Sequence, residues 1–399
     1  MRQIPRGNRE RVKEKRCNLM VTTHIFVVDE NTFPIHLEYM FAGTGAKEKE
    51  EHIGLLADIK RVRVGDNVIF YLQRVGEKEG GFFGLFKVKD HKPLVFKEPG
   101  GEYLFDELKK KLIYRTFIEP FQVYKRPVTE WEALDVLPEK STDILWSLIY
   151  RKLRALRGCT QITLEEAERL IALIRNNNNG KTFTSKIGYS YDSEEGEIIE
   201  GYSKKYTGKI IGLDTIKFLV EKYNKQRAFE VELQAFFTEN AGENIIKDIT
   251  GDKNEIIWLG NEVYCGVGMQ KIDVFTITES INQKLFRIIE LKDEFVLPTV
   301  IFQIKKYVEW TKQHMKGSNN NNIQPFVIAK KIPELSTGKI KLGKFEATLS
   351  GKKETIFFKK IIDAFKEFNK KKLALPIRYF EYEIFDSKNP KIIFNEINY

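Results

Sequence analysis

KIDVFTITESINQKLFRIIELK, residues 271–292, is the stretch that decides the fold of the C-terminal half of the chain. Both ends of it are rich in β-branched and aromatic residues, which predicts two strands, and the polar INQK between them suits a hairpin connection. Side chains two apart in a strand share a face, so Glu290 and Lys292 point the same way. If the strands pair, Asp273 lies beside Glu290, and two carboxylates then share a small space with one ammonium group.

This arrangement of charges has a chemical consequence. Neighbouring carboxylates repel each other and raise each other's pKa unless a cation lies between them. Mg²⁺ suits such a site, because it prefers oxygen ligands, uses one or two carboxylates and keeps its other positions for water and phosphate; Mn²⁺ is the alternative ion. The metal activates a water molecule, while Lys292 can stabilise charge that develops on phosphorus or orient that water. The pattern therefore predicts hydrolysis of phosphodiester bonds.

The order of these residues carries a family resemblance. Asp273, then Glu290-Leu-Lys292, then a helix with Gln303 and Tyr307 in QIKKYVEW, resembles the PD-(D/E)XK superfamily, the fold of many restriction and repair endonucleases. A single E-x-K triplet has little specificity, whereas the ordered set has more. One departure is Ile272, which stands before the aspartate where the family usually has proline.

The resemblance also implies an acidic residue on a helix before the hairpin. Glu230 in AFEVELQAFFTEN, residues 228–240, matches that position, and Glu232 is the near alternative. The likeness covers residues 215–399 and implies an α/β sandwich with a mixed sheet, the restriction endonuclease-like fold. It implies a metal site formed by Asp273, Glu290 and Glu230, with catalytic roles for the same three acids, Lys292 and Gln303.

The N-terminal part has a different pattern. VTTHIFVV at residues 21–28, VRVGDNVIFYLQ at 62–73 and GGFFGLFKVKD at 80–90 read as strands, with Gly65-Asp66 and Gly80-Gly81 as turn signals. Residues 18–125 are therefore expected to form a compact, mainly β domain, a small barrel.

The phrase VRVGDNVIFYLQ followed by GGFFGLFKV resembles the PUA-like superfamily, in particular its EVE and YTH branches. Such barrels can hold a flipped base in an aromatic pocket, where stacking offsets the cost of unstacking. The resemblance makes Tyr39, Phe41, Phe82 and Phe83 candidates for nucleic-acid contact, with a loop at residues 43–45 that a ligand can approach closely. The alternative is that these aromatic side chains are core residues.

Residues 126–214 are expected to form a helical connector and a linker. Helical spacing of apolar residues covers 131–137, 142–156 and 162–175, and Thr163 with Glu166 forms a capping-box pattern at the start of the last helix. Arg151 and Arg154 belong to a basic cluster that either faces a DNA backbone or is a solvated helix face. The polar run after residue 175 is a loop or linker in which a β-hairpin can form.

Composition narrows the class of protein. The 399 residues carry a net charge of +10, which favours polyanionic partners, and the first sixteen residues contribute seven Lys or Arg against two Glu. The three cysteines are too scattered for a disulfide framework or a zinc site. No apolar run reaches the length of a membrane span, and no secretory signal opens the chain, so we expect a cytoplasmic protein. Abundant Lys, Glu and Ile with few Met, Cys and His is typical of thermophile proteins.

Together these features predict a Mg²⁺-dependent endonuclease of the restriction type that acts on double-stranded DNA as a homodimer, with an N-terminal domain that reads a base or a modified base. A mismatch- or structure-directed DNA repair nuclease remains an alternative, as does an enzyme acting on RNA. A non-catalytic nucleic-acid-binding protein is the alternative outside enzymes. The chain contains no G-x-x-x-x-G-K-[ST] loop, which argues against a nucleotide-hydrolysing motor.

Overall fold

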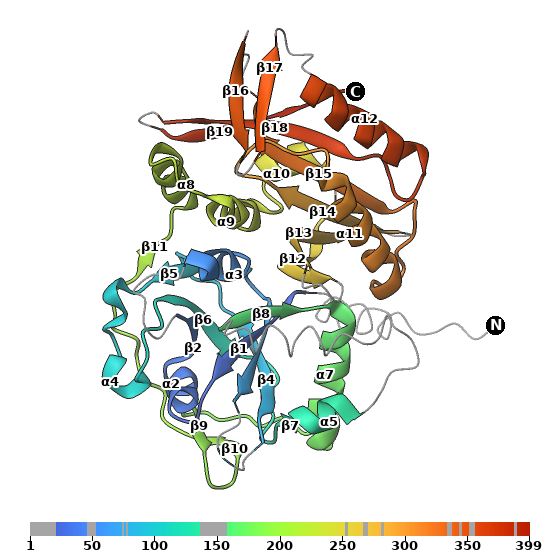
Figure 1. Cartoon of the computed structure of the whole chain (residues 1–399). Helices are drawn as coiled ribbons and strands as arrows, with labels where there is room; N and C mark the ends of the chain where they lie inside the picture. Colours follow the sequence, from blue (N-terminus) through green and yellow to red (C-terminus); the bar gives the residue numbers. More distant parts are fainter. Residues whose placement is uncertain are drawn as a thin grey trace, which may run out of the picture. The chain divides into compact units, whose positions relative to one another are not determined.

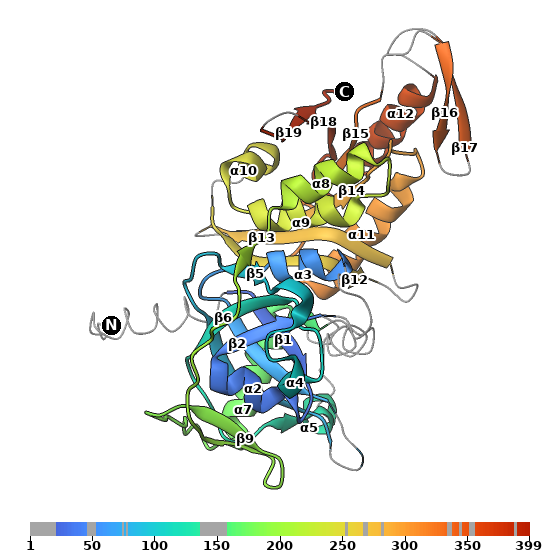
Figure 2. The same ribbon diagram turned by 90° about the vertical axis from the view of Figure 1, so that its left-hand side faces the viewer.

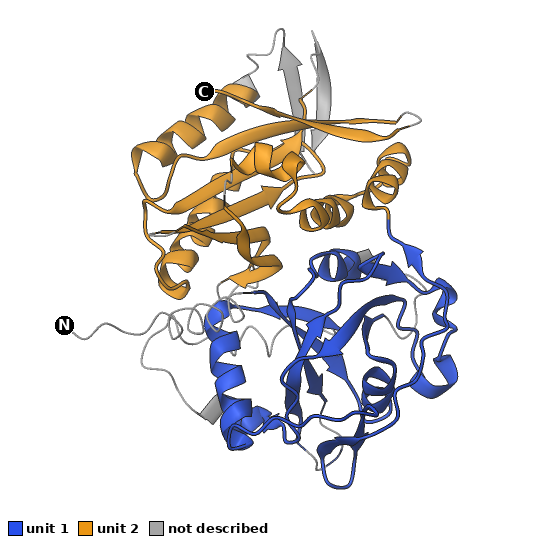
Figure 3. Cartoon of the chain, turned by 180° about the vertical axis from the view of Figure 1, so that it is seen from behind, with its two compact units in different colours: residues 1–213 blue, residues 214–399 orange. Residues whose placement is uncertain are grey.

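The computed structural model divides into two compact units, residues 1–213 and 214–399 (Figure 3). It describes residues 21–45, 53–73, 76, 79–135, 158–251, 254–265, 270–280, 283–332, 337–342, 345–350, 356–386 and 389–399. The boundary at Leu213/Asp214 lies one residue from the expected start of the second domain.

A mixed sheet forms the centre of unit 2. In the described residues its strand order is β12-β13-β14-β15-β18-β19 (Figure 1). The β12–β13–β14 meander and the β18–β19 pair are antiparallel, while β14, β15 and β18 run parallel to one another. The bounds are β12 Ile256–Cys265, β13 Gln270–Glu279, β14 Lys284–Leu291, β15 Ile323–Lys330, β18 Arg378–Phe385 and β19 Lys391–Glu396. A separate hairpin pairs β16 (Thr337–Leu342) with β17 (Phe345–Ser350).

Helices cover both faces of this sheet. The helices α8 (Thr215–Asn224), α9 (Glu230–Asn240) and α10 (Asn244–Thr250) share a hydrophobic core with every second strand residue, including Ile289, Leu291 and Phe380. The opposite face receives α12 (Ile356–Lys370), whose Phe365 ring lies 5.6 Å from that of Tyr379. Helix α11 (Val300–His314) packs beside α12 (Figures 1 and 2).

Unit 1 is built on a curled mixed sheet that wraps around its core (Figures 1 and 2). In the described residues the order is β11-β5-β6-β4-β3-β1-β8, with β2 added to β6 and β7 to β4. The β1–β3 pair is parallel, and the other pairs are antiparallel. The bounds are β1 Thr23–Val28, β2 Phe41–Thr44, β3 Asn67–Leu72, β4 Gly81–Val88, β5 Val95–Lys97, β6 Tyr114–Pro120, β7 Val128–Thr129, β8 Cys159–Ile162 and β11 Ile211–Gly212.

Short helices and one long helix complete unit 1. The long one is α7 (Leu164–Asn177), and the capping box is present: the Thr163 side chain accepts from Glu166 N, and Thr163 N donates to Glu166 Oε2 at 3.0 Å. A hairpin pairs β9 (Tyr189–Asp192) with β10 (Glu197–Glu200). The others are α2 Thr32–Tyr39, α3 Leu56–Lys60, α4 Phe105–Leu108, α5 Glu130–Asp135 and the 3₁₀ turns Ile53–Leu55 and Pro99–Gly101.

The expected connector needs correction. Strand β8 pairs with β1, and β11 pairs with β5, so both belong to the sheet of unit 1. The apolar face of α7 supplies Leu170 and Ile174 to a core shared with Ile25 and Phe82. The described parts of residues 126–213 are therefore integral to unit 1, because they bury apolar surface that the sheet would otherwise expose.

The strands and helices expected around the motif are observed. Strand β14 contains Glu290, β13 contains Asp273, α9 begins at Glu230, and α11 follows with Gln303. In the N-terminal unit, β1, β3 and β4 lie within the three stretches read as strands. The chain is thus a mixed α/β structure. Among the residues that the structure describes, no helix combines the length and apolar character needed to cross a membrane.

Candidate active site

The β13–β14 register brings the first two acidic residues together. At its end the antiparallel ladder pairs Val274 with Ile289. The same register, continued by one residue, places Asp273 opposite Glu290. Lys292 follows β14 and donates from Nζ to Glu290 Oε1 at 2.6 Å. The Glu290 side chain is 1% exposed and that of Lys292 is 26% exposed, so this ion pair opens to solvent only on the lysine side.

Both carboxylate oxygens of Asp273 are held by neighbouring groups. Leu291 N donates to Asp273 Oδ2 at 2.8 Å, which ties the aspartate to the next strand. Gln234 Nε2 donates to Asp273 Oδ1 at 3.1 Å, and Gln234 is itself buried. Gln234 was not predicted from the sequence, although its position four residues after Glu230 places both side chains on one helix face.

Helix α9 is fixed to the end of β14 by a hydrogen bond. Phe229 N, at the start of the helix, donates to Asp293 Oδ2 at 3.0 Å. This contact places Glu230 close enough to Lys292 and Glu290 for their charges to act on it. The alternative acid, Glu232, lies 3.6 Å from Lys222 Nζ on α8 and is 2% exposed. Of the two candidate acids, Glu230 is the one whose pKa is shifted by the charges of Lys292 and Glu290.

Charges in this cluster perturb one another strongly. Burial, and after it the charge of Glu290, raise the pKa of Asp273 well above its usual value. Burial also raises the pKa of Glu230, and Lys292 partly opposes this. Burial alone would lower the pKa of Lys292, but the surrounding carboxylates raise it. Such opposed shifts in one small cluster are typical of functional sites.

Helix α11 covers the cluster with an aromatic residue. Tyr307 OH donates to Lys271 O at 2.7 Å, which fixes the ring of this residue against β13. Burial and the charges of Glu290 and Asp273 raise the pKa of Tyr307. Gln303 lies on the same helix one turn earlier and is half-buried.

The fit of these residues to a divalent cation rests on Glu290. Its Oε2 atom is buried and accepts no hydrogen bond from the described residues, so a carboxylate oxygen is left for another partner. Among those same residues, no three His, Cys, Asp or Glu side chains converge into a complete metal cage. Mg²⁺ usually takes only one or two protein carboxylates and completes its shell with water and phosphate. The donor set of Glu290 and Asp273 therefore suits Mg²⁺ or Mn²⁺ better than a caged structural ion.

The aromatic residues suggested for base contact in unit 1 are mostly in its core. Phe41, Phe82 and Phe83 are 0%, 2% and 1% exposed. Successive residues of a strand point to opposite faces, and both faces are covered: Phe82 packs with the α7 core, while the Phe83 ring lies 4.9 Å from that of Phe33 on α2. The four candidates thus do not converge on one cavity.

Tyr39 differs from the other three because it is half-buried. It packs at the margin of a cluster that contains Phe41, and its ring lies 6.4 Å from that of Tyr103. The guanidinium of the buried Arg115 lies 5.0 Å from the centre of the Phe41 ring, in the same cluster. Arg151 and Arg154 lie outside the described residues.

Comparisons with known proteins add little to this geometry. No protein-family model matches the chain, and no curated protein matches it. Among solved structures, a hypothetical protein from Leishmania major is 13% identical with a TM-score of 0.29, covering 39% of this chain and 96% of its own. Human THYN1 protein, solved in complex with 5-methylcytosine containing DNA, is 12% identical with a TM-score of 0.29, covering 38% and 96%.

Proposed function

We propose that the protein is a metal-dependent endonuclease that hydrolyses phosphodiester bonds in double-stranded DNA, with its active site at Asp273, Glu290 and Lys292. The observation that carries the proposal is the buried Glu290 carboxylate: one oxygen pairs with Lys292, and the other accepts no hydrogen bond from any residue that the structure describes. The order of elements in unit 2 supports the PD-(D/E)XK interpretation of its sequence.

The residues divide the chemistry between them. Asp273 and Glu290 would hold Mg²⁺, with Glu230 at the margin, and the ion would supply positive charge at the scissile phosphate and lower the pKa of a water ligand. Gln234 and Leu291 N fix the Asp273 carboxylate, so it needs no reorganisation during the reaction. Lys292 donates protons in hydrogen bonds from a partly exposed ammonium, which suits it to orient the attacking water or stabilise the phosphorane charge.

Unit 1 would select the DNA. Its curled sheet and the PUA-like sequence phrase support a base-reading domain, of the kind that a modification-dependent restriction enzyme uses. Since each active site cuts one strand, a homodimer would cut both. A DNA repair nuclease would use the same active site and differ in the substrate that unit 1 selects.

Cleavage of plasmid DNA in Mg²⁺ tests the proposal. Unmodified plasmid and plasmids with modified cytosine or adenine are incubated with the wild type and with Asp273→Ala and Lys292→Met. We expect discrete fragments from the wild type only, and the plasmid that is cut identifies any required modification. Glu232→Gln is the matched control for Glu230→Gln: the first should keep activity and the second should lose most of it. Metal-independent cutting, or cutting that survives Asp273→Ala, would refute the assignment.

A further inference from the structure

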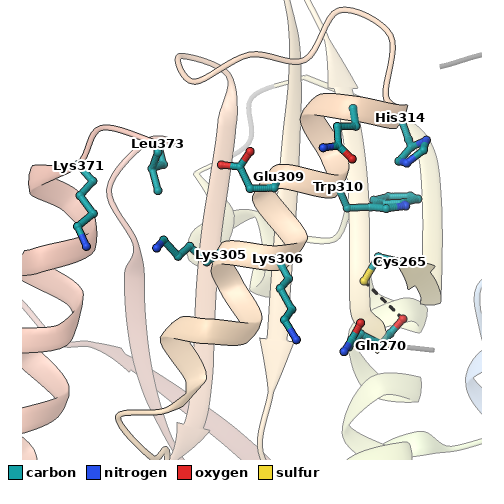
Figure 4. Close-up of a pocket in the computed structure, with 10 residues that line it drawn as sticks. Cys265, Gln270, Lys305, Lys306, Glu309, Trp310, His314, Lys371 and Leu373 are labelled. Carbon is teal, nitrogen blue, oxygen red and sulfur yellow. Dashed lines mark hydrogen bonds between the residues drawn. The ribbon is translucent and has the colours of Figure 1, made fainter. Parts of the chain in front are cut away.

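Unit 2 contains a groove beside the carboxylate cluster, with a volume of about 860 Å³ (Figure 4). It is bordered by the exposed face of α11, by the residues that follow α12 and by the ends of β12 and β13. Its lining includes Lys305, Lys306, Lys371, Trp310, His314 and Cys265.

Lysine side chains dominate the charge of this groove. Lys305 and Lys306 are exposed on α11, and neither forms an ion pair with another described residue. The acid on the same face, Glu309, is paired with Lys312 at 2.9 Å. In Figure 4 the Lys305 side chain extends toward Lys371, while that of Lys306 extends toward Gln270. Lys371 is paired with Glu367 at 2.8 Å, so Lys305 and Lys306 are the lining lysines that no acid of the described residues pairs with.

The floor of the groove is apolar and aromatic. Trp310 is 7% exposed, and the centre of its ring lies 5.4 Å from that of His314. An apolar surface flanked by cations suits the backbone of a polynucleotide strand, whose sugars contact the floor while its phosphates meet the lysines. It suits a small acidic metabolite less well, because the lysines are spread along the groove and do not converge on one point.

One end of the groove adjoins the proposed active site. Cys265 lies at the end of β12, and its Sγ donates to Gln270 O at 3.4 Å. Burial and then the charges of Glu290 and Asp273 raise the pKa of the Cys265 thiol to about 12, while Lys306 opposes them. Cys265 is thus near the carboxylates and near Lys306 at once. On α11 itself, Lys306 directly precedes Tyr307, which covers the cluster.

We propose that this groove binds the sugar-phosphate backbone of the DNA strand that is cut, and that Lys305 and Lys306 contact its phosphates next to the scissile bond. The proposal rests on the nuclease function above and adds to it the path of the strand. Lys371, at the far end from Cys265 in Figure 4, would mark the other end of the bound segment.

Binding without cleavage tests this path. The full-length chain with Asp273→Ala is titrated against a fluorescein-labelled duplex of about 20 base pairs, at several salt concentrations, and anisotropy gives Kd. Adding Lys305→Ala and Lys306→Ala should weaken binding about tenfold or more and reduce the salt slope by about two, since each lost phosphate contact removes about 0.9. Lys305→Arg with Lys306→Arg should restore both quantities.

The control removes two lysines on the other face of the sheet: Lys217 in α8, which pairs with Asp214, and Lys225 at the C-cap of α8, which pairs with Glu221. Lys217 and Lys225 are 73% and 53% exposed, and Lys217→Ala with Lys225→Ala should change Kd less than about twofold. Equal effects of the two pairs would overturn the proposal, as would a lysine dependence seen with duplex RNA but absent with DNA. Wild-type cleavage separates the two proposals. If the wild type cuts DNA but binding does not depend on Lys305 and Lys306, the proposed strand path is rejected and the nuclease function stands. If binding depends on these lysines but no DNA is cut, the nuclease function is rejected.

Discussion

Replacing Lys292 with methionine tests the charge balance of the proposed active site. Met keeps the shape of the lysine stem and removes the ammonium that pairs with Glu290 at 2.6 Å. Removing one partner of a fully buried pair costs about 3–5 kcal/mol. Because the Lys292 side chain is 26% exposed, water offsets part of this cost. We therefore expect the free energy of unfolding to fall by about 2 kcal/mol at neutral pH. For a unit of this length that lowers Tm by about 4–8 °C.

The stability lost in Lys292→Met should increase as pH rises. Burial raises the pKa of Asp273 and of Glu230, and Lys292 opposes both shifts, so its removal raises both pKa values further. An acid with a raised folded-state pKa contributes stability that is present at low pH and lost as pH rises through that pKa. The deficit of Lys292→Met relative to wild type should therefore be small near pH 5 and larger near pH 8.

Calorimetric unfolding of the full chain without metal, at both pH values, measures this. Glu290→Gln is the control, because it removes a carboxylate and leaves a lysine that can reach solvent. The double variant Glu290→Gln with Lys292→Met should be more stable than Lys292→Met alone, since the unpaired buried charge is gone. A deficit independent of pH, or a double variant no more stable than Lys292→Met, would refute this description of the cluster.

Gln234→Leu should lower metal affinity or cleavage about tenfold or more with little change in far-UV circular dichroism, because the hydrogen bond to Asp273 Oδ1 orients that carboxylate; equal activity would contradict it. The cleavage rate in Mg²⁺ should rise with pH as Asp273 loses its proton, and a rate that falls from pH 6 to pH 8 would count against Asp273 as a ligand. Burial raises the pKa of Glu166 to about 8, so the urea stability of unit 1 should fall between pH 5 and about 8, and Glu166→Gln should abolish most of that fall.

The hairpin at the active site could be predicted because its signals are local. Alternation places Glu290 and Lys292 on one face, and the short INQK segment sets an antiparallel pairing in which Asp273 comes opposite Glu290. The helix that begins at Glu230 was also visible as an apolar pattern. These features depend on residues within one hairpin or one helix, and such short-range patterns are what a single sequence carries best.

Gln234 and Asp293 could not be assigned from the sequence, because their roles depend on contacts across the fold. Gln234 reaches Asp273 through the packing of α9 on the sheet, and Asp293 holds the start of that helix. Neither residue belongs to a motif of its own. The sequence signal for each residue was its position: Gln234 lies about one helical turn after Glu230, and Asp293 directly follows Lys292.

The assignment of residues 126–214 to a connector failed for a similar reason. Helix α7 and its capping box were predicted correctly, but its place in the core depends on pairing between β1 and β8, which are far apart in sequence. The burial of Phe82 and Phe83 follows from the same long-range packing, because a strand covered on both faces hides both sets of side chains. Local patterns do not say which faces of a sheet are covered.

Mn²⁺ binding measured by isothermal titration calorimetry tests the central claim most directly, since the proposed hydrolysis requires Asp273 and Glu290 to hold a divalent cation. The wild type should bind one ion per chain at this site and release protons, because burial keeps the pKa of Asp273 raised in the absence of metal. Asp273→Ala and Glu290→Gln should each abolish that binding while the fold persists. Binding of the same stoichiometry and affinity in both variants would contradict the account.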